Sequence, residues 1–309
     1  MLGWVLLAGA AVLLVVGAEL FVENVAGAAR GLGLTVLATG VLLAGAEPEE
    51  MLTGILASAG GRPELAAGDA VGANVTMLTV ALGLAAVLRP LPVGRRVRGY
   101  AVGAAAAGLL AVCALADGTV SRWDGGGLVA VYVGLVTLVW WREREPPAVG
   151  ELAEEAGEDR RSRAPRRGIA LAVVGVVVMG LGGNLAIRGA SRVVDSLGVT
   201  DSAVGLTALA LATTAELFAL AFAAVRRDVP EVAVAGVVGS AVYNATVSLG
   251  VAALVHPLRV GGVLGAAVAA AVLPLAVVVL SARGRLTRPA GAVLVAGYAA
   301  FLLVVLVGT

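Results

Sequence analysis

The stretch "LLAGAEPEEML", residues 42–52, places three carboxylates and a proline inside an apolar run. Its flanks, "LGLTVLATGV" (32–41) and "LTGILASA" (52–59), are typical of membrane-embedded helix. A carboxylate at membrane depth costs about 3 kcal/mol or more unless it faces a cavity, a partner or an ion. The stretch therefore predicts a membrane protein with a polar site inside it.

The composition extends this prediction to the whole chain. Of 309 residues, 60% are hydrophobic and 14% are charged, whereas a soluble domain carries about 25% charged residues. Apolar stretches long enough to cross a hydrocarbon core of about 30 Å recur along the sequence. They lie near 2–22, 32–58, 65–88, 99–116, 125–141, 168–187, 199–225, 231–254, 260–280 and 289–308. We predict an all-α polytopic membrane protein with ten transmembrane helices.

The basic residues, all arginine, predict the orientation, because positive charge resists translocation. With the N-terminus outside, 17 arginines fall in cytoplasmic connections and five fall outside. The one long hydrophilic segment, 142–167, then becomes a cytoplasmic linker. We expect a multi-pass protein of the cell membrane with both termini outside.

The two halves of the chain repeat each other. Residues 42–91 match 209–258 at 17 of 50 positions with an offset of 167, which is more than the bias towards Ala, Val, Leu and Gly alone gives. The prediction is one five-helix repeat over 1–141 and a second over 168–309, with the most similar parts at about 35–85 and 200–252. Because each half has five helices, the second enters the membrane inverted, an architecture of many secondary transporters.

The repeat pairs two acids at membrane depth, Glu49 and Glu216. Neither has an arginine nearby in its span, and two facing carboxylates repel each other, so we expect a bound cation or protons there. Glu47 and Glu50 pair with Thr214 and Leu217, and are expected to be accessory or vestibule acids. Pro48, beside them, should interrupt the helix and free backbone carbonyls as ligands.

Further oxygen ligands are expected from the neighbouring spans. "GDAVGANVT" (68–76) supplies a carboxylate and an amide, and "AGVVGSAVYN" (235–244) supplies a hydroxyl and an amide. Hard cations prefer such oxygen donors. The predicted metal ligands are Glu49, Glu216, Asp69, Asn74, Thr213, Ser240 and Asn244.

With these motifs in place, the chain resembles the calcium/cation antiporter superfamily, the sodium/calcium exchangers and their prokaryotic relatives. That family carries G-T-S-x-P-E in the second and seventh spans and G-N/D-x-x-G-S-N in the third and eighth. The corresponding segments here are "AGAEPE" (44–49), "LATTAE" (211–216), "GDAVGAN" (68–74) and "AGVVGSA" (235–241). The resemblance implies that Glu49 and Glu216 bind ions, and that a cation, most simply calcium, is exchanged for sodium or protons by alternating access.

Some family oxygens are absent, since Gly45 and Ala46 replace a hydroxyl pair and Ala241 replaces an amide or acid. Calcium seeks six to eight oxygens. An antiporter of a different cation and a transport-inactive or sensory relative therefore stay open as alternatives.

An intramembrane hydrolase is disfavoured, because "AAGDAVG" (66–72) has no second aspartate motif, and we expect no enzyme. The expected partners are cations and the lipid bilayer, not nucleic acid, and the transported cation is the only expected ligand in place of a cofactor.

Overall fold

The computed structural model describes residues 1–31, 46–143, 165–226 and 230–307. Six of its helices are long and apolar enough to cross a membrane, and a bent pair makes a seventh among the described residues. The helices are α1 (Leu2–Gly31), α3 (Pro48–Ala59), α4 (Pro63–Thr76), α5 (Leu82–Leu88), α6 (Arg95–Leu115), α7 (Arg122–Glu143), α9 (Pro165–Leu197), α10 (Asp201–Val204), α11 (Ala210–Thr213), α12 (Ala215–Arg226), α13 (Pro230–Tyr243), α14 (Leu249–Val255), α15 (Leu264–Leu280) and α16 (Arg288–Val307). The prediction of a helical, multi-spanning chain is confirmed.

The helix bounds repeat along the chain. The helices α12, α13 and α14 begin and end 167 residues after α3, α4 and α5. Single π-helical turns follow the same rule: η1 (Met77–Ala81) joins α4 to α5, and η3 (Asn244–Ser248) joins α13 to α14. Hydropathy predicted helices over 65–88 and 231–254 but no π-turn within them. Such π-turns lie frequently at functional sites.

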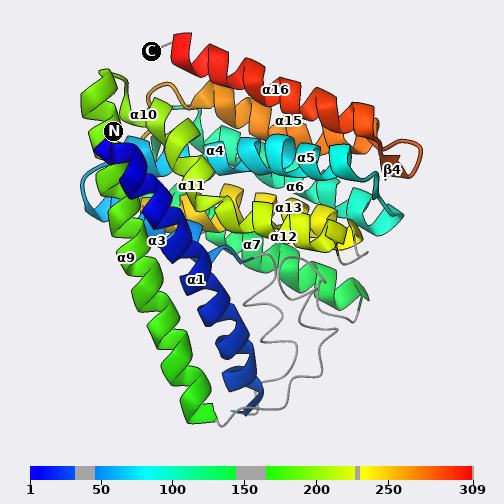
Figure 1. Cartoon of the computed structure of the whole chain (residues 1–309), viewed down its shortest axis with the longest axis horizontal. Helices are drawn as coiled ribbons and strands as arrows, with labels where there is room; N and C mark the ends of the chain where they lie inside the picture. The colour runs from blue at the N-terminus through cyan, green and yellow to red at the C-terminus, as the bar shows by residue number, and fades with distance from the viewer. Residues whose placement is uncertain (32–45, 144–164, 227–229, 308–309) are drawn as a thin grey trace.

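The first helices of the two halves, α1 and α9, pack antiparallel through glycines. A Cβ on Gly175 would lie 2.7 Å from the carbonyl oxygen of Gly17, and one on Gly189 would lie 3.0 Å from that of Gly3. Small residues allow backbones to approach this closely. In Figure 1 the pair runs across the molecule at a steep angle to α4, α6 and α16.

Both of these helices are longer than the predicted spans 2–22 and 168–187. α1 continues to Gly31, and α9 ends only at Leu197, before Gly198 with φ 68°. A left-handed glycine at this position is the usual C-terminal stop. Arg188 and Arg192, expected in an outer connection, therefore lie in the last turns of α9.

The predicted span 199–225 is broken rather than continuous. α10, the π-turn η2 (Gly205–Leu209) and α11 form its first part, and α12 begins after a bend of 44° at Thr214. In the first half, Pro48 is the first residue of α3, a position where proline costs no hydrogen bond. Ala215 begins α12 at the matching position, so the break does not depend on the proline.

Two short antiparallel ladders tie the halves together. β1 (Leu91–Pro92) pairs with β4 (Arg285–Leu286), and β2 (Thr119–Val120) pairs with β3 (Leu258–Arg259). Each ladder joins a strand of one half to a strand of the other. The halves are therefore interlocked as well as packed.

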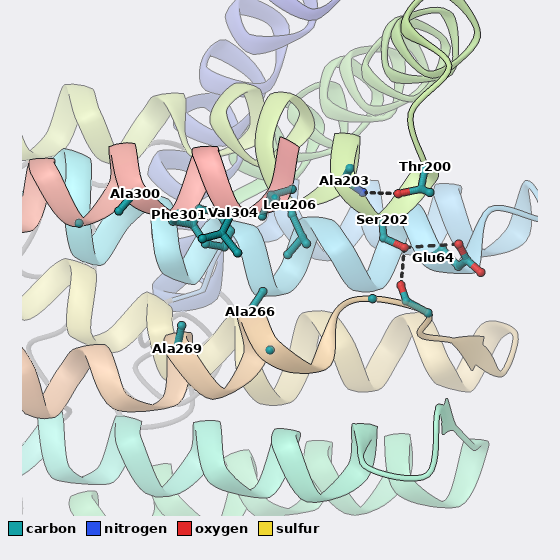
Figure 2. A pocket seen from close by; sticks show the side chains of 15 residues that line it. Glu64, Thr200, Ser202, Ala203, Leu206, Ala266, Ala269, Ala300, Phe301 and Val304 are labelled. Atoms are coloured by element: carbon teal, nitrogen blue, oxygen red, sulfur yellow. Dashed lines mark hydrogen bonds between the residues drawn. The ribbon is translucent and has the colours of Figure 1, made fainter. Parts of the chain in front are cut away.

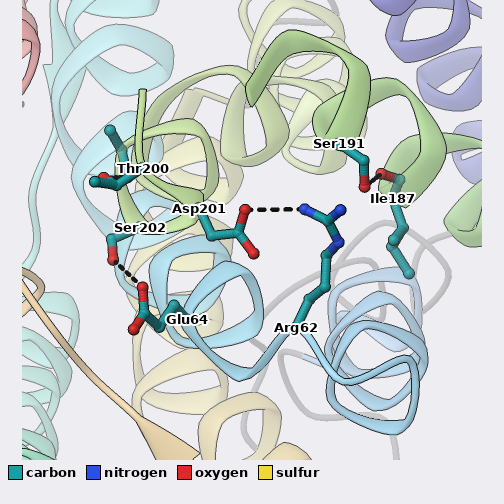
Figure 3. A network of polar contacts seen from close by, with 8 residues as sticks. Arg62, Glu64, Ile187, Ser191, Thr200, Asp201 and Ser202 are labelled. Atoms are coloured by element: carbon teal, nitrogen blue, oxygen red, sulfur yellow. Dashed lines mark hydrogen bonds and ion pairs between the residues drawn. The ribbon is translucent and has the colours of Figure 1, made fainter. Parts of the chain in front are cut away.

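Polar contacts also join the α3–α4 turn to the start of α10, as Figure 3 shows. Arg62 forms an ion pair with Asp201 at 2.9 Å. The Ser202 hydroxyl donates to the Gly261 carbonyl at 2.6 Å and lies 3.4 Å from a Glu64 oxygen. These contacts fix the start of α4, which carries two predicted ligands.

Candidate cation-binding site

The acids of the opening stretch all lie inside the protein, at the start of α3. Glu47 is 5% exposed, and Glu49 and Glu50 are each 1% exposed. Glu216 occupies the matching first turn of α12 and is 8% exposed. Helix N-termini carry partial positive charge, which favours carboxylates at these places. The first turns of α3 and α12 thus position one repeat-related glutamate in each half.

Ser240 lies against Glu47, and its hydroxyl donates a hydrogen bond to one carboxylate oxygen of that residue. This contact joins the N-terminus of α3 to α13 across the two halves. Glu47 also precedes Pro48 as the N-cap residue of α3. Sequence reasoning treated Glu47 as an accessory acid because Thr214 is its repeat partner, yet it is one of the buried acids of this region.

Thr213 and Asp69, both predicted as ligands, are brought together by the structure. The Thr213 hydroxyl donates to Asp69 Oδ1 at 3.1 Å, at the bend between α11 and α12. Asp69 lies in the middle of α4 and is 1% exposed. The break in the seventh predicted span therefore faces a carboxylate of the third.

Glu50 lies beside the same pair. Its carboxylate interacts electrostatically with those of Asp69, Glu47 and Glu49. Thr213 is also close; its hydroxyl lies within hydrogen-bond distance of Asp69 Oδ1 and of the Leu209 and Ala210 carbonyls. In the described part of the chain, neither Glu50 oxygen nor Asp69 Oδ2 has a hydrogen-bond partner. The sequence did indicate that Glu50 lies near Glu47, because residues three apart in a helix lie on the same face.

The side-chain amides of Asn74 and Asn244 make different hydrogen bonds. Asn74 donates from Nδ2 to the backbone carbonyl of Ala241 at 3.1 Å, which is its own counterpart in the repeat. Asn74 therefore contacts its equivalent position in the other half directly. The Asn244 oxygen accepts from Ser248 at 2.8 Å within its own helical segment, so that oxygen is already engaged.

The acids form a strongly negative region rather than a compact cluster of acidic ligands. Among the described residues no set of three or more His, Cys, Asp or Glu side chains is arranged to hold a metal ion. A bound ion would need hydroxyl, amide or backbone oxygens as well, as hard cations accept. No arginine or histidine whose side-chain burial the structure describes is buried, and none of these lies among the five buried carboxylates.

A cavity of about 700 Å³ lies elsewhere, between the starts of α4 and α10 and the helices α15 and α16. Figure 2 shows Glu64 and Ser202 at its polar end, with Ala266, Ala269 and Phe301 along its apolar wall. None of the seven predicted ligands lines it. The cavity and the acids are therefore separate features.

Known proteins share this fold and sequence pattern. Residues 2–141 and 167–307 match the family described as sodium/calcium exchanger protein. A protein of Alkalimonas amylolytica named as an antiporter, CaxA, is 26% identical over 80% of this chain and 78% of its own length. The inner membrane protein YrbG of Escherichia coli (strain K12) is 26% identical over 73% of this chain and 69% of its own. A structure of the sodium-calcium exchanger NCX_Mj superposes with a TM-score of 0.63, at 21% identity over 100% of this chain and 98% of that one.

Proposed function

Because the chain belongs to the sodium/calcium exchanger protein family, we propose that it is a secondary cation antiporter of the membrane. The observation that carries the proposal is the pair of buried glutamates, Glu49 and Glu216, in the equivalent first turns of α3 and α12. Buried ionisable groups in membrane-spanning regions mark ion pathways. Matched relatives are named as an antiporter and as exchangers, not as enzymes.

The proposed architecture has ten spans in two inverted halves, with both termini outside and the central linker in the cytoplasm. The antiparallel packing of α1 and α9, the first helices of the two halves, supports the inversion. The recurrence of helix bounds at 167 residues supports the repeat. Span 32–58 is described only from Ala46 on, and linker residues 144–164 lie outside the described ranges.

The proposed cargo is calcium, exchanged for sodium or protons by alternating access. Glu49 and Glu216 supply one carboxylate each, and Asn74, which contacts its equivalent position in the other half, offers an amide oxygen that accepts no hydrogen bond from the described residues. Ser240, Thr213, Asp69 and Asn244 complete the proposed ligand set. Ala241 supplies only a backbone oxygen, which Asn74 already contacts, so a cation that needs fewer ligands than calcium is the second candidate.

The test is calcium-45 uptake into proteoliposomes that contain the purified protein, driven by an outward sodium gradient or by a pH gradient. Glu49→Gln and Glu216→Gln should each abolish uptake. Glu64→Gln, which neutralises a carboxylate at the start of α4 outside the acid region, is the matched control and should leave uptake intact. Gradient-independent or absent uptake by the folded wild-type protein would refute calcium exchange and favour another cation or a transport-inactive relative.

A further inference from the structure

We propose that the cavity between α4, α10, α15 and α16 binds a membrane lipid whose head group carries a primary ammonium, with Glu64 as the residue that receives this ammonium. The cavity has a volume of about 700 Å³, and its polar residues gather at one end (Figure 2). None of the predicted cation ligands lines it. The proposal concerns lipid binding and not ion transport, so it is independent of the proposed antiport.

The polar residues of the cavity lie at the ends of helices. Glu64 is in the first turn of α4, Thr200 and Ser202 are at the start of α10, and Gly261 precedes α15. The span Pro63–Leu88 has 26 residues, a length of about 39 Å, whereas the hydrocarbon core is about 30 Å thick. The first turn of α4 therefore reaches the level of the lipid head groups.

The rest of the lining is apolar and open to the side. Ala269 on α15 and Ala300 on α16 are exposed, and Val304 is 72% exposed. Phe301 lies beside them along the same wall (Figure 2). Exposed apolar side chains on membrane-spanning helices face the acyl chains of the bilayer. A lipid can therefore enter this cavity from the membrane itself.

Two glycines leave room for an acyl chain, Gly265 on α15 and Gly297 on α16. A Cβ at either position would meet no protein atom within 4 Å. Sites for small molecules typically measure about 300–1,000 Å³ and combine a mainly apolar lining with a few polar groups. A cavity with its polar groups at the level of the head groups and its apolar wall in the hydrocarbon core matches an amphiphile in that orientation.

The charge at the polar end selects the head group. Glu64 is half-buried and forms no ion pair with a described residue. Arg62, two positions earlier, is paired with Asp201 at 2.9 Å. The Ser202 hydroxyl lies 2.6 Å from the Gly261 carbonyl and 3.4 Å from Glu64 Oε2, so one proton serves two acceptors. A carboxylate has about four acceptor positions, and Glu64 therefore keeps most of them for a cation.

A primary ammonium fits this end better than the other common head groups. It donates up to three N–H hydrogen bonds, and such bonds to a carboxylate are strengthened by charge. A quaternary ammonium carries the charge but has no N–H group. An anionic head group would be repelled by Glu64, and no arginine is among the described residues that line the cavity. The phosphate of an ethanolamine lipid is two carbons away from the ammonium and can stay in the surrounding water.

The test is native mass spectrometry of the full-length protein after incubation with equal amounts of phosphatidylethanolamine, phosphatidylcholine and phosphatidylglycerol that carry the same acyl chains. The wild type should retain phosphatidylethanolamine about fivefold over phosphatidylcholine, as expected for one charge-assisted hydrogen bond at a half-buried site. Glu64→Gln should bring this ratio close to one. Asp195→Asn, which neutralises an exposed carboxylate of α9 outside the cavity, is the matched control and should keep the wild-type ratio.

A second pair of variants tests the place of the acyl chain. Gly297→Leu puts a side chain into the cavity and should lower the retained phosphatidylethanolamine by about fivefold or more, because the leucine takes the space of the lipid. Gly134→Leu is the matched control on α7, at an exposed position where an added Cβ also meets nothing within 4 Å. It should retain as much of this lipid as the wild type.

A charge reversal guards against a general loss of fold. Glu64→Lys should retain phosphatidylglycerol over phosphatidylethanolamine, and a damaged protein would not gain such a preference. Three results would overturn the inference: equal retention of the three lipids by the wild type, an unchanged lipid ratio in Glu64→Gln, or full retention by Gly297→Leu. Failure of the proposed antiport is distinguishable, because it would appear in ion uptake and leave these lipid ratios as they are.

Discussion

Gly72 sets the distance between α4 and η2, and replacing it with alanine should destabilise the protein measurably. A Cβ at this position would lie 2.5 Å from the carbonyl oxygen of Leu206, 2.6 Å from its Cα and 2.7 Å from its carbonyl carbon. All three are backbone atoms, so no side-chain rotation relieves the overlap, and the two segments must separate by roughly 1 Å. Overpacking of this kind costs about 1–3 kcal/mol.

Part of this loss is offset, because alanine stabilises a helix interior by about 0.5–1 kcal/mol relative to glycine. With the central values of both ranges, the net loss for Gly72→Ala is about 1 kcal/mol. The matched control is Gly103→Ala in α6, where an added Cβ meets nothing within 4 Å, and which should be neutral or slightly stabilising. Denaturation of both proteins in one detergent, followed by tryptophan fluorescence, measures the difference. Equal stability of Gly72→Ala and the wild type would refute the close packing of α4 on η2.

Three further substitutions probe other contacts by the same measurement. Ser58→Ala should cost about 1 kcal/mol, because the buried hydroxyl donates at 2.7 Å to a carbonyl of α14, and an unchanged midpoint would contradict that bond. Arg62→Ala should change stability by less than about 1 kcal/mol, since Arg62 and Asp201 are 31% and 24% exposed; a loss of several kcal/mol would mean that the pair is more than a surface contact. Ser121→Ala should cost about 1 kcal/mol by breaking the reciprocal capping bonds between Ser121 and Asp124, whereas no loss would show that α7 does not need its cap.

Hydropathy and repeat matching predicted the helical membrane fold well, because both depend on composition averaged over about 20 residues. They could not locate the π-turns at Met77–Ala81 and Asn244–Ser248, which differ from α-helix by a hydrogen-bond shift that leaves no mark on hydropathy. The lengths of α1 and α9 were also underestimated. Helix continues past the apolar core into polar residues such as Arg188, where hydropathy falls but helix propensity does not.

For the candidate site, the repeat was the more informative signal. It singled out Glu49 and Glu216, both of which are buried at equivalent helix starts. The same signal undervalued Glu47 and Glu50, because neither has an acidic counterpart. Their surroundings depend on contacts from other spans, Ser240 to Glu47 and Asp69 near Glu50, which no local pattern encodes.

Proline stands at the start of α3, in the first half only, and not at the equivalent start of α12. Pro48 does begin α3, but the second half bends by 44° at Thr214 without a proline. The bend residue itself has a buried hydroxyl bonded to the carbonyl of Ala210. Hydroxyl bonds back to the preceding turn are a known cause of helix bending. A search for proline alone would miss this class of break.

The central claim is that one ion is shared by Glu49 and Glu216 across the two halves. Calcium-45 binding to Glu49→Gln, Glu216→Gln and the double variant tests it most directly. If both glutamates hold the same ion, each single change should remove binding nearly completely, and the double variant should be no worse than either one. Two separable losses, each leaving a measurable fraction of the binding and adding in the double variant, would contradict the shared site.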